Sequence, residues 1–308
     1  MKPFLIAFVF LAALTAGAQV VTHERAVMVR VTNLYLSPDP SSAKLGETER
    51  GREVVILETS REWLHVLADV TAERSVTGWI TDKGVVRAST PNGDKILYGE
   101  AVDSEDEGSR RHGRRGADKD AFRLYYRTAE YFPNSPLAGA ALYRAADVRW
   151  QVEKEEVMSR PSAREKEAYL RVGMDEQWMK EVMKRFPNTR WADLAAFHLI
   201  DNKLCGDWQG SSKCPEKESE LYEKHAQERP DSPAAPEALY KAAWRQSALI
   251  EIYKTETKAD KSREAAARAS ALCQRLMDKY PQSDWATRAV RLNYLIQQGI
   301  PTYGNATD

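Results

Sequence analysis

The sequence predicts a multidomain protein, in which a small all-β barrel precedes an all-α solenoid of helical repeats. Residues 26–90 alternate apolar and polar side chains in short runs separated by Pro, Gly, Asp and Ser, which is typical of short antiparallel strands. From residue 118 onward, a proline, a small polar residue and an alanine-rich amphipathic segment recur together four times, which indicates an internal repeat.

The bulk composition excludes some classes of partner. The chain has 308 residues with 45 basic and 45 acidic side chains, so its formal net charge is zero and gives no reason to expect a nucleic-acid partner. With 43% hydrophobic and 29% charged residues, the composition is that of an ordinary globular protein, and most of the chain is expected to fold.

Residues 1–18 have the pattern of a signal peptide. One lysine and a short apolar run precede Ala16-Gly17-Ala18, which fits the small-x-small rule for cleavage. We therefore expect an exported protein, periplasmic or extracellular, with an uncleaved anchor as the alternative. No later segment approaches the roughly 20 apolar residues that a membrane span requires, so no transmembrane segment is expected in the mature chain.

Residues 20–90 form the predicted β unit, with strand-like runs AVMVRV, EVVILE, WLHVL and TGWI. The unit resembles the bacterial SH3 domain family. Residues 33–38, Asn-Leu-Tyr-Leu-Ser-Pro, stand where that family has an Asn-apolar-Arg-x-x-Pro turn, with Tyr35 in place of the arginine, and Gly78-Trp79-Ile80 matches a late Gly-Trp-Val strand. The resemblance implies an SH3-like barrel that binds cell-wall peptide or a protein partner.

The aromatic residues of this unit allow two interpretations. Trp63 and Trp79 are expected in the barrel core, because aromatic side chains dominate small cores, and a ligand-stacking role is the alternative. Alternation along the strand places His65 on the face opposite Leu64 and Val66, at the surface or an edge.

Residues 91–117 are predicted to be a charged, flexible linker. Acidic residues at 100–107 precede arginines at 110, 111, 114 and 115, and apolar side chains nearly vanish after Val102. Such a segment has little apolar surface to bury. The alternative is that Arg110–Arg115 docks on an anionic partner such as a wall polymer or lipid headgroups.

Residues 118–298 form the predicted helical repeats, which are anchored on four prolines: Pro133, Pro187, Pro230 and Pro281. Each proline is expected to end one helix, because it lacks an amide donor and restricts the residue before it. A hydroxyl two positions later is expected to cap the next helix: Ser135, Thr189, Ser232 and Ser283. Alanines five and eight positions after each proline share one helix face, where they allow close approach of a neighbouring helix.

These units resemble tetratricopeptide-type repeats with Tyr/Phe-Pro-x-Ser/Thr between helices, as in periplasmic proteins of outer-membrane assembly and cell-division coordination. The resemblance implies stacked helix pairs that create a groove for a partner protein. Residues 299–308 remain as a C-terminal tail.

Cys205 and Cys214 are predicted to form a structural disulfide, since export permits oxidation and the loop between them is rich in Gly and Ser. Two free thiols are the alternative, and a zinc site lacks the necessary ligands. The register places Cys273 and His225 at positions that are mostly apolar in the other repeats, which favours packing roles for both.

The sequence contains no catalytic motif, and its five histidines are scattered, so we expect no enzyme, cofactor or metal site. Two hypotheses remain. The protein is either a non-enzymatic cell-envelope scaffold or adaptor that binds a partner protein through its repeat groove, or a peptidoglycan-targeting protein whose SH3-like domain binds the wall while its repeats recruit partners.

Overall fold

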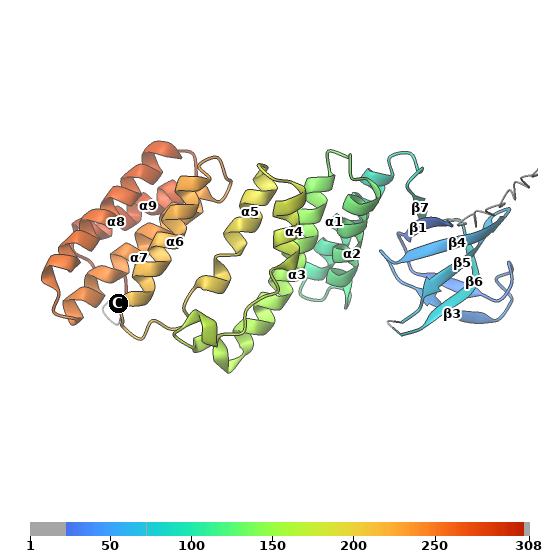
Figure 1. The fold of residues 1–308 in the computed structure, drawn as a ribbon, viewed down its shortest axis with the longest axis horizontal. Coiled ribbons are helices and arrows are strands. Elements are labelled where there is room, and N and C mark those ends of the chain that lie inside the picture. The colour runs from blue at the N-terminus through green and yellow to red at the C-terminus, as the bar shows by residue number, and fades with distance from the viewer. Residues whose placement is uncertain (1–22, 72, 305–308) are drawn as a thin grey trace, which may run out of the picture.

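A computed structural model describes residues 23–71 and 73–304, so the predicted signal peptide lies outside the described residues. A β-sheet occupies one end of an elongated molecule, and the helices follow one another from it to the other end (Figure 1). The predicted order of an all-β part followed by an all-α part is therefore observed.

The strands form a single open antiparallel sheet in the order β3-β2-β6-β5-β4-β1-β7. Their bounds are β1 (Glu24–Met28), β2 (Thr32–Tyr35), β3 (Lys44–Thr48), β4 (Glu53–Ser60), β5 (Trp63–Asp69), β6 (Ser75–Thr81) and β7 (Val85–Arg87). The predicted barrel is wrong. Closure would require the edge strands β3 and β7 to pair, but β7 has three residues, pairs only with β1, and leads through a turn into the first helix.

One face of the sheet carries the small core of this part of the chain. Alternation sends Leu34, Leu64, Val66 and Ile80 into a cluster with Ala26, Met28 and Val54, all of them fully buried. The prediction that Trp63 and Trp79 belong to this core is wrong. Each alternates with a buried neighbour, so both lie on the opposite face and are only partly buried.

The helices are α1 (Gly93–Ser109), α2 (Ala117–Tyr131), α3 (Ala138–Ser159), α4 (Gln177–Arg185), α5 (Arg190–His198), α6 (Lys213–Glu228), α7 (Ala235–Thr255), α8 (Ala259–Lys279) and α9 (Asp284–Gln297). Short 3₁₀ turns at Pro161–Arg164, Ala168–Leu170 and Asp201–Lys203 interrupt the longer connections. These connections lie in the first two intervals between the anchoring prolines, whereas the third interval is filled by the helices α7 and α8, of 21 residues each.

Helix α1 corrects the prediction of a flexible linker over 91–117. Leu97, Ala101 and Ser104 are fully buried at spacings of four and three residues, so one side of α1 packs on the protein. Of its carboxylates, Asp103 and Asp106 are exposed, whereas Glu105 accepts a hydrogen bond from Tyr125 over 2.8 Å. The helical part therefore begins at residue 93, and only the turn at 110–116 resembles the predicted linker.

The prediction that each anchoring proline follows a helix end is confirmed. Helices α2, α4, α6 and α8 each end two residues before their proline. The side chains of Thr189 and Ser283 cap the next helix as predicted. Ser135 and Ser232 instead accept from the amide two residues on, and the helix starts a residue after that, because a second proline follows each serine.

The repeat alanines lie in closely packed seams. All eight are buried: Ala138, Ala141, Ala192, Ala195, Ala235, Ala238, Ala286 and Ala289. The helices share two large apolar clusters, one running from the sheet to α5 and the other joining α5 to α9. The start of the predicted tail is not detached, since the ring of Tyr303 lies 5.3 Å from that of Trp208.

Among the helices of the described region, none combines the length and the apolar character needed to cross a membrane.

Candidate functional site

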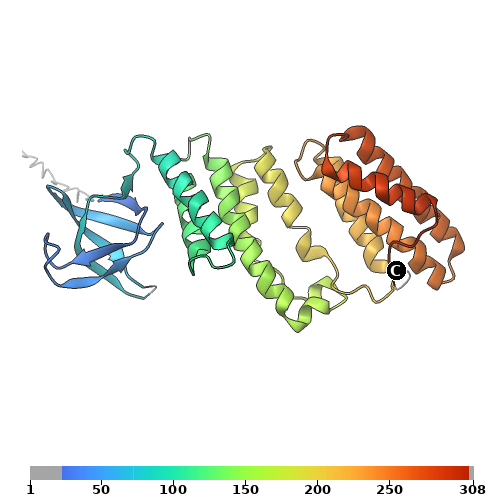
Figure 2. The ribbon, with the colours of Figure 1, turned by 180° about the vertical axis from the view of Figure 1, so that it is seen from behind.

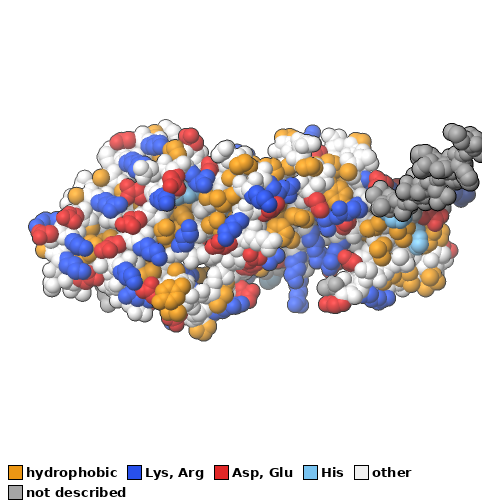
Figure 3. Space-filling model, viewed as in Figure 1, with side chains coloured by type: hydrophobic (Ala, Val, Ile, Leu, Met, Phe, Trp, Pro, Cys, Tyr) orange, Lys and Arg blue, Asp and Glu red, His pale blue; other side chains and the backbone are white. Residues whose placement is uncertain are grey.

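A groove of about 480 Å³ lies where the sheet meets the helices. We call it the junction groove. Its sheet wall contains Val55 of β4 and Leu67 and Asp69 of β5, and its helical wall contains Phe122, Arg123, Tyr126 and Arg127 of α2 with Trp178 of α4. Figure 3 shows Lys and Arg side chains gathered in the hollow between the two parts.

Three aromatic rings dominate the helical wall. The ring of Trp178 stands nearly perpendicular to those of Phe122 and Tyr126, with centroid separations of 5.1 and 5.3 Å. Such edge-to-face contacts hold each ring in one orientation. All three side chains remain partly exposed, so they present a preformed apolar surface to the groove.

Arginines frame these rings. The guanidinium of Arg149 lies 5.7 Å from the Trp178 ring, and that of Arg127 lies the same distance from Tyr126. Arg149 also donates to Glu153 over 2.8 Å, and Arg127 lies 2.9 Å from Glu53. The charges of Arg149 and Arg127 are thus paired with carboxylates. What the groove presents to a ligand is therefore mainly a set of oriented aromatic rings.

Ion pairs and a tight turn fix the sheet against α2. Arg123 donates to Glu49 over 2.6 Å. Gly51, in the turn before β4, has a φ of +70°, and a β-carbon there would lie 2.5 Å from that of Arg123. Only glycine fits such a turn so close to a helix. The two walls of the groove are therefore held at a defined separation.

A second hollow of about 330 Å³ continues the groove along α2 and α3. It shares Phe122 and Arg123 with the junction groove and adds Val148 and the exposed Val152. Apart from Gly51, the residues that line the junction groove are aromatic and aliphatic side chains together with arginines and carboxylates, and they include no Ser, Cys or His.

A second aromatic cluster lies on the face of the sheet away from its core. The ring of His65 stacks on Trp79 at 5.0 Å, and Tyr35 meets Trp63 edge to face at 5.9 Å. We call these four residues the sheet aromatic face. The predicted position of His65, opposite the buried Leu64 and Val66, is confirmed.

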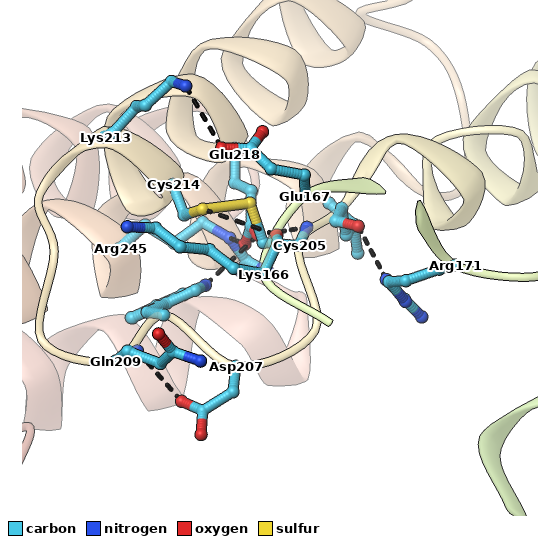
Figure 4. Close-up of a disulfide and its surroundings, with 12 residues drawn as sticks. Lys166, Glu167, Arg171, Cys205, Asp207, Gln209, Lys213, Cys214, Glu218 and Arg245 are labelled. Atoms are coloured by element: carbon cyan, nitrogen blue, oxygen red, sulfur yellow. Dashed lines mark hydrogen bonds and ion pairs between the residues drawn. A yellow bond between two sulfur atoms is a disulfide. The ribbon is translucent and has the colours of Figure 1, made fainter. Parts of the chain in front are cut away.

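The structure joins Cys205 and Cys214, which is compatible with the predicted disulfide. The bond holds the loop before α6 over a buried carboxylate, that of Glu218 (Figure 4). Glu218 accepts from the Cys205 amide over 2.9 Å and from Arg245 over 2.7 Å. Trp208 also donates to this carboxylate, so its buried charge is paired and hydrogen-bonded.

Cys273, His225 and the arginines of the turn at 110–116 were also singled out in the sequence. Cys273 is fully buried, and burial raises the pKa of its thiol to about 12, so it is unreactive. His225 is buried beside Phe197 with its Nε2 atom unpaired. In the turn at 110–116, Arg110 and Arg111 are exposed, while Arg114 pairs with Asp120 over 2.8 Å.

Sequence reasoning missed the junction groove. Its lining residues come from four elements, β4, β5, α2 and α4, whose meeting depends on the packing of the sheet. The one available signal was the aromatic content of the helices, since Trp178 occupies a register position that Leu124, Leu221 and Leu272 hold elsewhere. Within the described residues, no group of His, Cys, Asp or Glu is arranged to hold a metal ion.

Comparison with known proteins gives two kinds of result. No family model matches the chain, and no curated protein matches it. Among solved structures it is similar to the DHF58 filament, with 16% identity over 67% of this chain and 91% of that one, at a TM-score of 0.25. It is also similar to the DHF79 filament, with 14% identity over 65% and 96% of the two chains, at a TM-score of 0.20. At such TM-scores neither likeness supports an inference about this protein.

Proposed function

We propose that the protein is a non-enzymatic adaptor of the cell envelope, which holds a segment of a partner protein in the junction groove. The observation that carries this proposal is the trio of partly exposed rings, Phe122, Tyr126 and Trp178, in a groove whose walls are fixed. Rigid aromatic side chains in a pocket are typical of residues that dominate protein interfaces.

The groove favours an apolar anchor in its partner. Val55 and Leu67 face the aromatic wall across the groove, while the nearby arginines already have carboxylate partners. An extended segment that places one aromatic or aliphatic side chain between these walls would bury it without leaving a charge unpaired. The zero net charge of the chain agrees with recognition by shape rather than by long-range attraction.

A photo-cross-linking experiment tests the proposal. A benzophenone amino acid placed at position 178 of the full chain, in the cells that make it, should capture a partner that mass spectrometry then identifies. With that partner purified, Tyr126→Ala should weaken binding at least about tenfold, as expected for an interface anchor. The control is Tyr169→Ala, an exposed tyrosine that does not line the groove. Equal binding by Y126A and Y169A would contradict the proposal.

Export is part of this proposal. Two features support it: the signal-peptide pattern of residues 1–18 and a disulfide in a chain with a buried free cysteine. Intact-mass analysis of the purified protein should show a chain that begins at Gln19. Retention of Met1 would contradict export by cleavage.

The sheet aromatic face favours a second candidate, in which the protein binds peptidoglycan. Tyr35, Trp63, His65 and Trp79 present adjacent rings on a partly exposed surface, and such rings stack on flat or apolar ligand faces. Co-sedimentation of the full chain with purified sacculi tests this candidate. Trp79→Ala should reduce the bound fraction while Tyr169→Ala should not, and an absence of co-sedimentation by the unaltered chain would exclude it.

A further inference from the structure

The last helix exposes positions that the earlier repeats bury. Nine residues after the anchoring proline stand Leu142 and Leu239, which are 0% and 1% exposed, whereas Val290 of α9 is 56% exposed. Thirteen residues after it, Ala146 and Ala243 are buried, while Tyr294 is 58% exposed. Both register positions are apolar in all four units. In the second unit Ala196 is partly buried and Ile200 is buried, whereas α9 leaves both positions open to solvent.

The earlier repeats show what normally covers these positions. Leu239 and Ala243 lie in one apolar cluster with Leu272 and Leu276 of α8. Likewise Ile200, which aligns with Tyr294, clusters with Tyr222 and Ala226 of α6. In each case the first helix of the following unit supplies the covering side chains. At α9 the stack ends, and Figure 2 shows α8 and α9 at the end of the molecule remote from the sheet.

The uncovered surface is slightly hollowed. A shallow, open hollow of about 560 Å³ is lined by Met277 in the last turn of α8, by Pro281 after it, and by Thr287, Val290, Arg291 and Tyr294 of α9. We call it the terminal groove. Arg291 is its only charged residue. It stands ten residues after the proline, where the earlier units have Tyr143, Phe197 and Tyr240, so this end differs from the internal seams by one positive charge.

A second copy of the chain does not fit the terminal groove. Head-to-tail stacking is blocked, because the sheet covers the other end of the helical stack, with Val27 and Val86 packed in one cluster with Leu97 of α1. Tail-to-tail packing of two α9 helices about Val290 would carry Arg291 of each copy into the contact, and the lining residues include no carboxylate to pair with it. A charge that is buried without a partner is destabilising.

We propose that the terminal groove binds an amphipathic helix of another protein, and that this helix carries a carboxylate opposite Arg291. The bound helix takes the place that α4, α6 and α8 take on the preceding units, with apolar side chains at spacings of three and four residues over Val290 and Tyr294. This site is independent of the junction groove, which lies at the opposite end of the helices, so the protein would join two partners at once.

Peptides from the protein's own repeats provide probes. The sequence of α6, residues 213–228 with Cys214→Ser, has five glutamates and three lysines, so its side-chain charge is 3 − 5 = −2. The sequence of α8, residues 259–279, has five basic and three acidic residues, and its charge is 5 − 3 = +2. Each peptide is made with a side-chain lactam that holds it helical, because short helices are marginal in water, and with a fluorescent label.

Fluorescence anisotropy with the full chain measures binding. The α6 peptide should bind saturably, and at least about tenfold more tightly than the α8 peptide. Val290→Glu should abolish binding. Arg291→Glu should weaken it about fivefold, whereas Arg288→Glu, at an exposed arginine of α9 outside the groove, should leave it unchanged. Since Val290 and both arginines are exposed, these variants should fold normally.

Three results would overturn the inference. One is the absence of saturable binding of the α6 peptide. Another is equal binding by V290E and the unaltered chain. The third is a dimer of the unaltered chain in sedimentation equilibrium that V290E abolishes, which would assign the terminal groove to self-association instead.

Discussion

The hydroxyl of Tyr131, at the end of α2, donates a 2.9 Å hydrogen bond to the carboxylate of Glu53, which opens β4. The two residues are 78 positions apart, and the bond ties the sheet to the helices beside the junction groove. Arg25 and Arg127 also pair with Glu53, over 2.7 and 2.9 Å. Burial, followed by the contact with Glu53, raises the pKa of Tyr131, so this phenol stays a donor at any physiological pH.

Glu53→Gln should loosen this junction. The amide keeps the size of the side chain but removes its charge, which leaves Glu130 as the carboxylate that Arg25 and Arg127 still share. We expect a loss of about 1–2 kcal/mol in the free energy of unfolding, measured by urea titration. The control is Glu58→Gln on the exposed end of the same strand, which should change stability by less than about 0.5 kcal/mol. Equal effects would mean that the junction is not held through Glu53.

Trypsin should cut first in the turn at 110–116, where Arg110 and Arg111 are exposed. The two products should nevertheless elute together from a gel-filtration column, because α1 packs on α2 through Leu97, Ala101 and Tyr125. Early cleavage at Lys95, or separation of the products, would instead support the flexible linker that the charge pattern suggests.

Helix α1 shows why a count of charges misleads. Its sequence has many carboxylates, but a helix needs only one stripe of apolar or small side chains to pack, and Leu97, Ala101 and the small Ser104 supply it. By contrast, the helix ends were predictable because proline acts locally, on its own amide and its neighbour. Whether the sheet closes into a barrel, and where the junction groove forms, were not predictable, because both depend on contacts between elements distant in sequence. The hydrogen bond between Tyr131 and Glu53, beside the groove, is one such contact.

The disulfide should contribute to stability through the unfolded state. It closes a short loop, with the two α-carbons 6.1 Å apart, and the loop-entropy estimate for such a ring is somewhat under about 3 kcal/mol. Cys205→Ser with Cys214→Ser should therefore lower the free energy of unfolding by about 2 kcal/mol in the absence of reductant. With reductant present, the unaltered chain should approach the variant. Equal stability of the two chains without reductant would show that the bond is absent or adds nothing.

His225 should make the protein less stable in mild acid. Burial, aided by Arg229, lowers its pKa to about 4, against the opposing charges of Asp193 and Glu228. An unfolded chain takes up this proton below about pH 6.5, whereas the folded protein resists until about pH 4. The stability associated with the neutral ring is thus present above pH 6.5 and is lost as the pH falls toward 4, by about 2–3 kcal/mol.

His225→Leu tests this dependence, because the aligned position in the last repeat is the buried Leu276. The variant should lose less stability than the unaltered chain between pH 6.5 and 4, as measured by urea titration at each pH. His112→Leu, in the exposed turn at 110–116, is the matched control and should keep the full dependence. Parallel pH curves for all three chains would contradict the assignment.

Two polar residues that the repeat register places on the outer faces of helices have partners in the structure. Lys241 lies 5.0 Å from the ring of Phe197, and Asp193 pairs with Arg229 over 2.6 Å. Substitutions there would disturb contacts between neighbouring helices. Neither Lys241 nor Asp193 is therefore a suitable control site for substitutions of the buried seam alanines. An exposed alanine is a better control.

Leucine at the seam alanines tests the stacking of the helices. Ala195 and Ala238 are completely buried in the two large apolar clusters, so Ala195→Leu or Ala238→Leu forces extra methyl groups into filled space. Each should lower the free energy of unfolding by about 1–3 kcal/mol through overpacking. Ala267→Leu, on the exposed side of α8, makes the same chemical change in open solvent and should be nearly neutral, because both residues are good helix formers. Thermal and urea unfolding of the three full-length variants would measure this difference. If leucine were tolerated at both seams as well as at Ala267, the helices would not be closely stacked, and the helical wall that positions Trp178 in the junction groove would lose its rigidity.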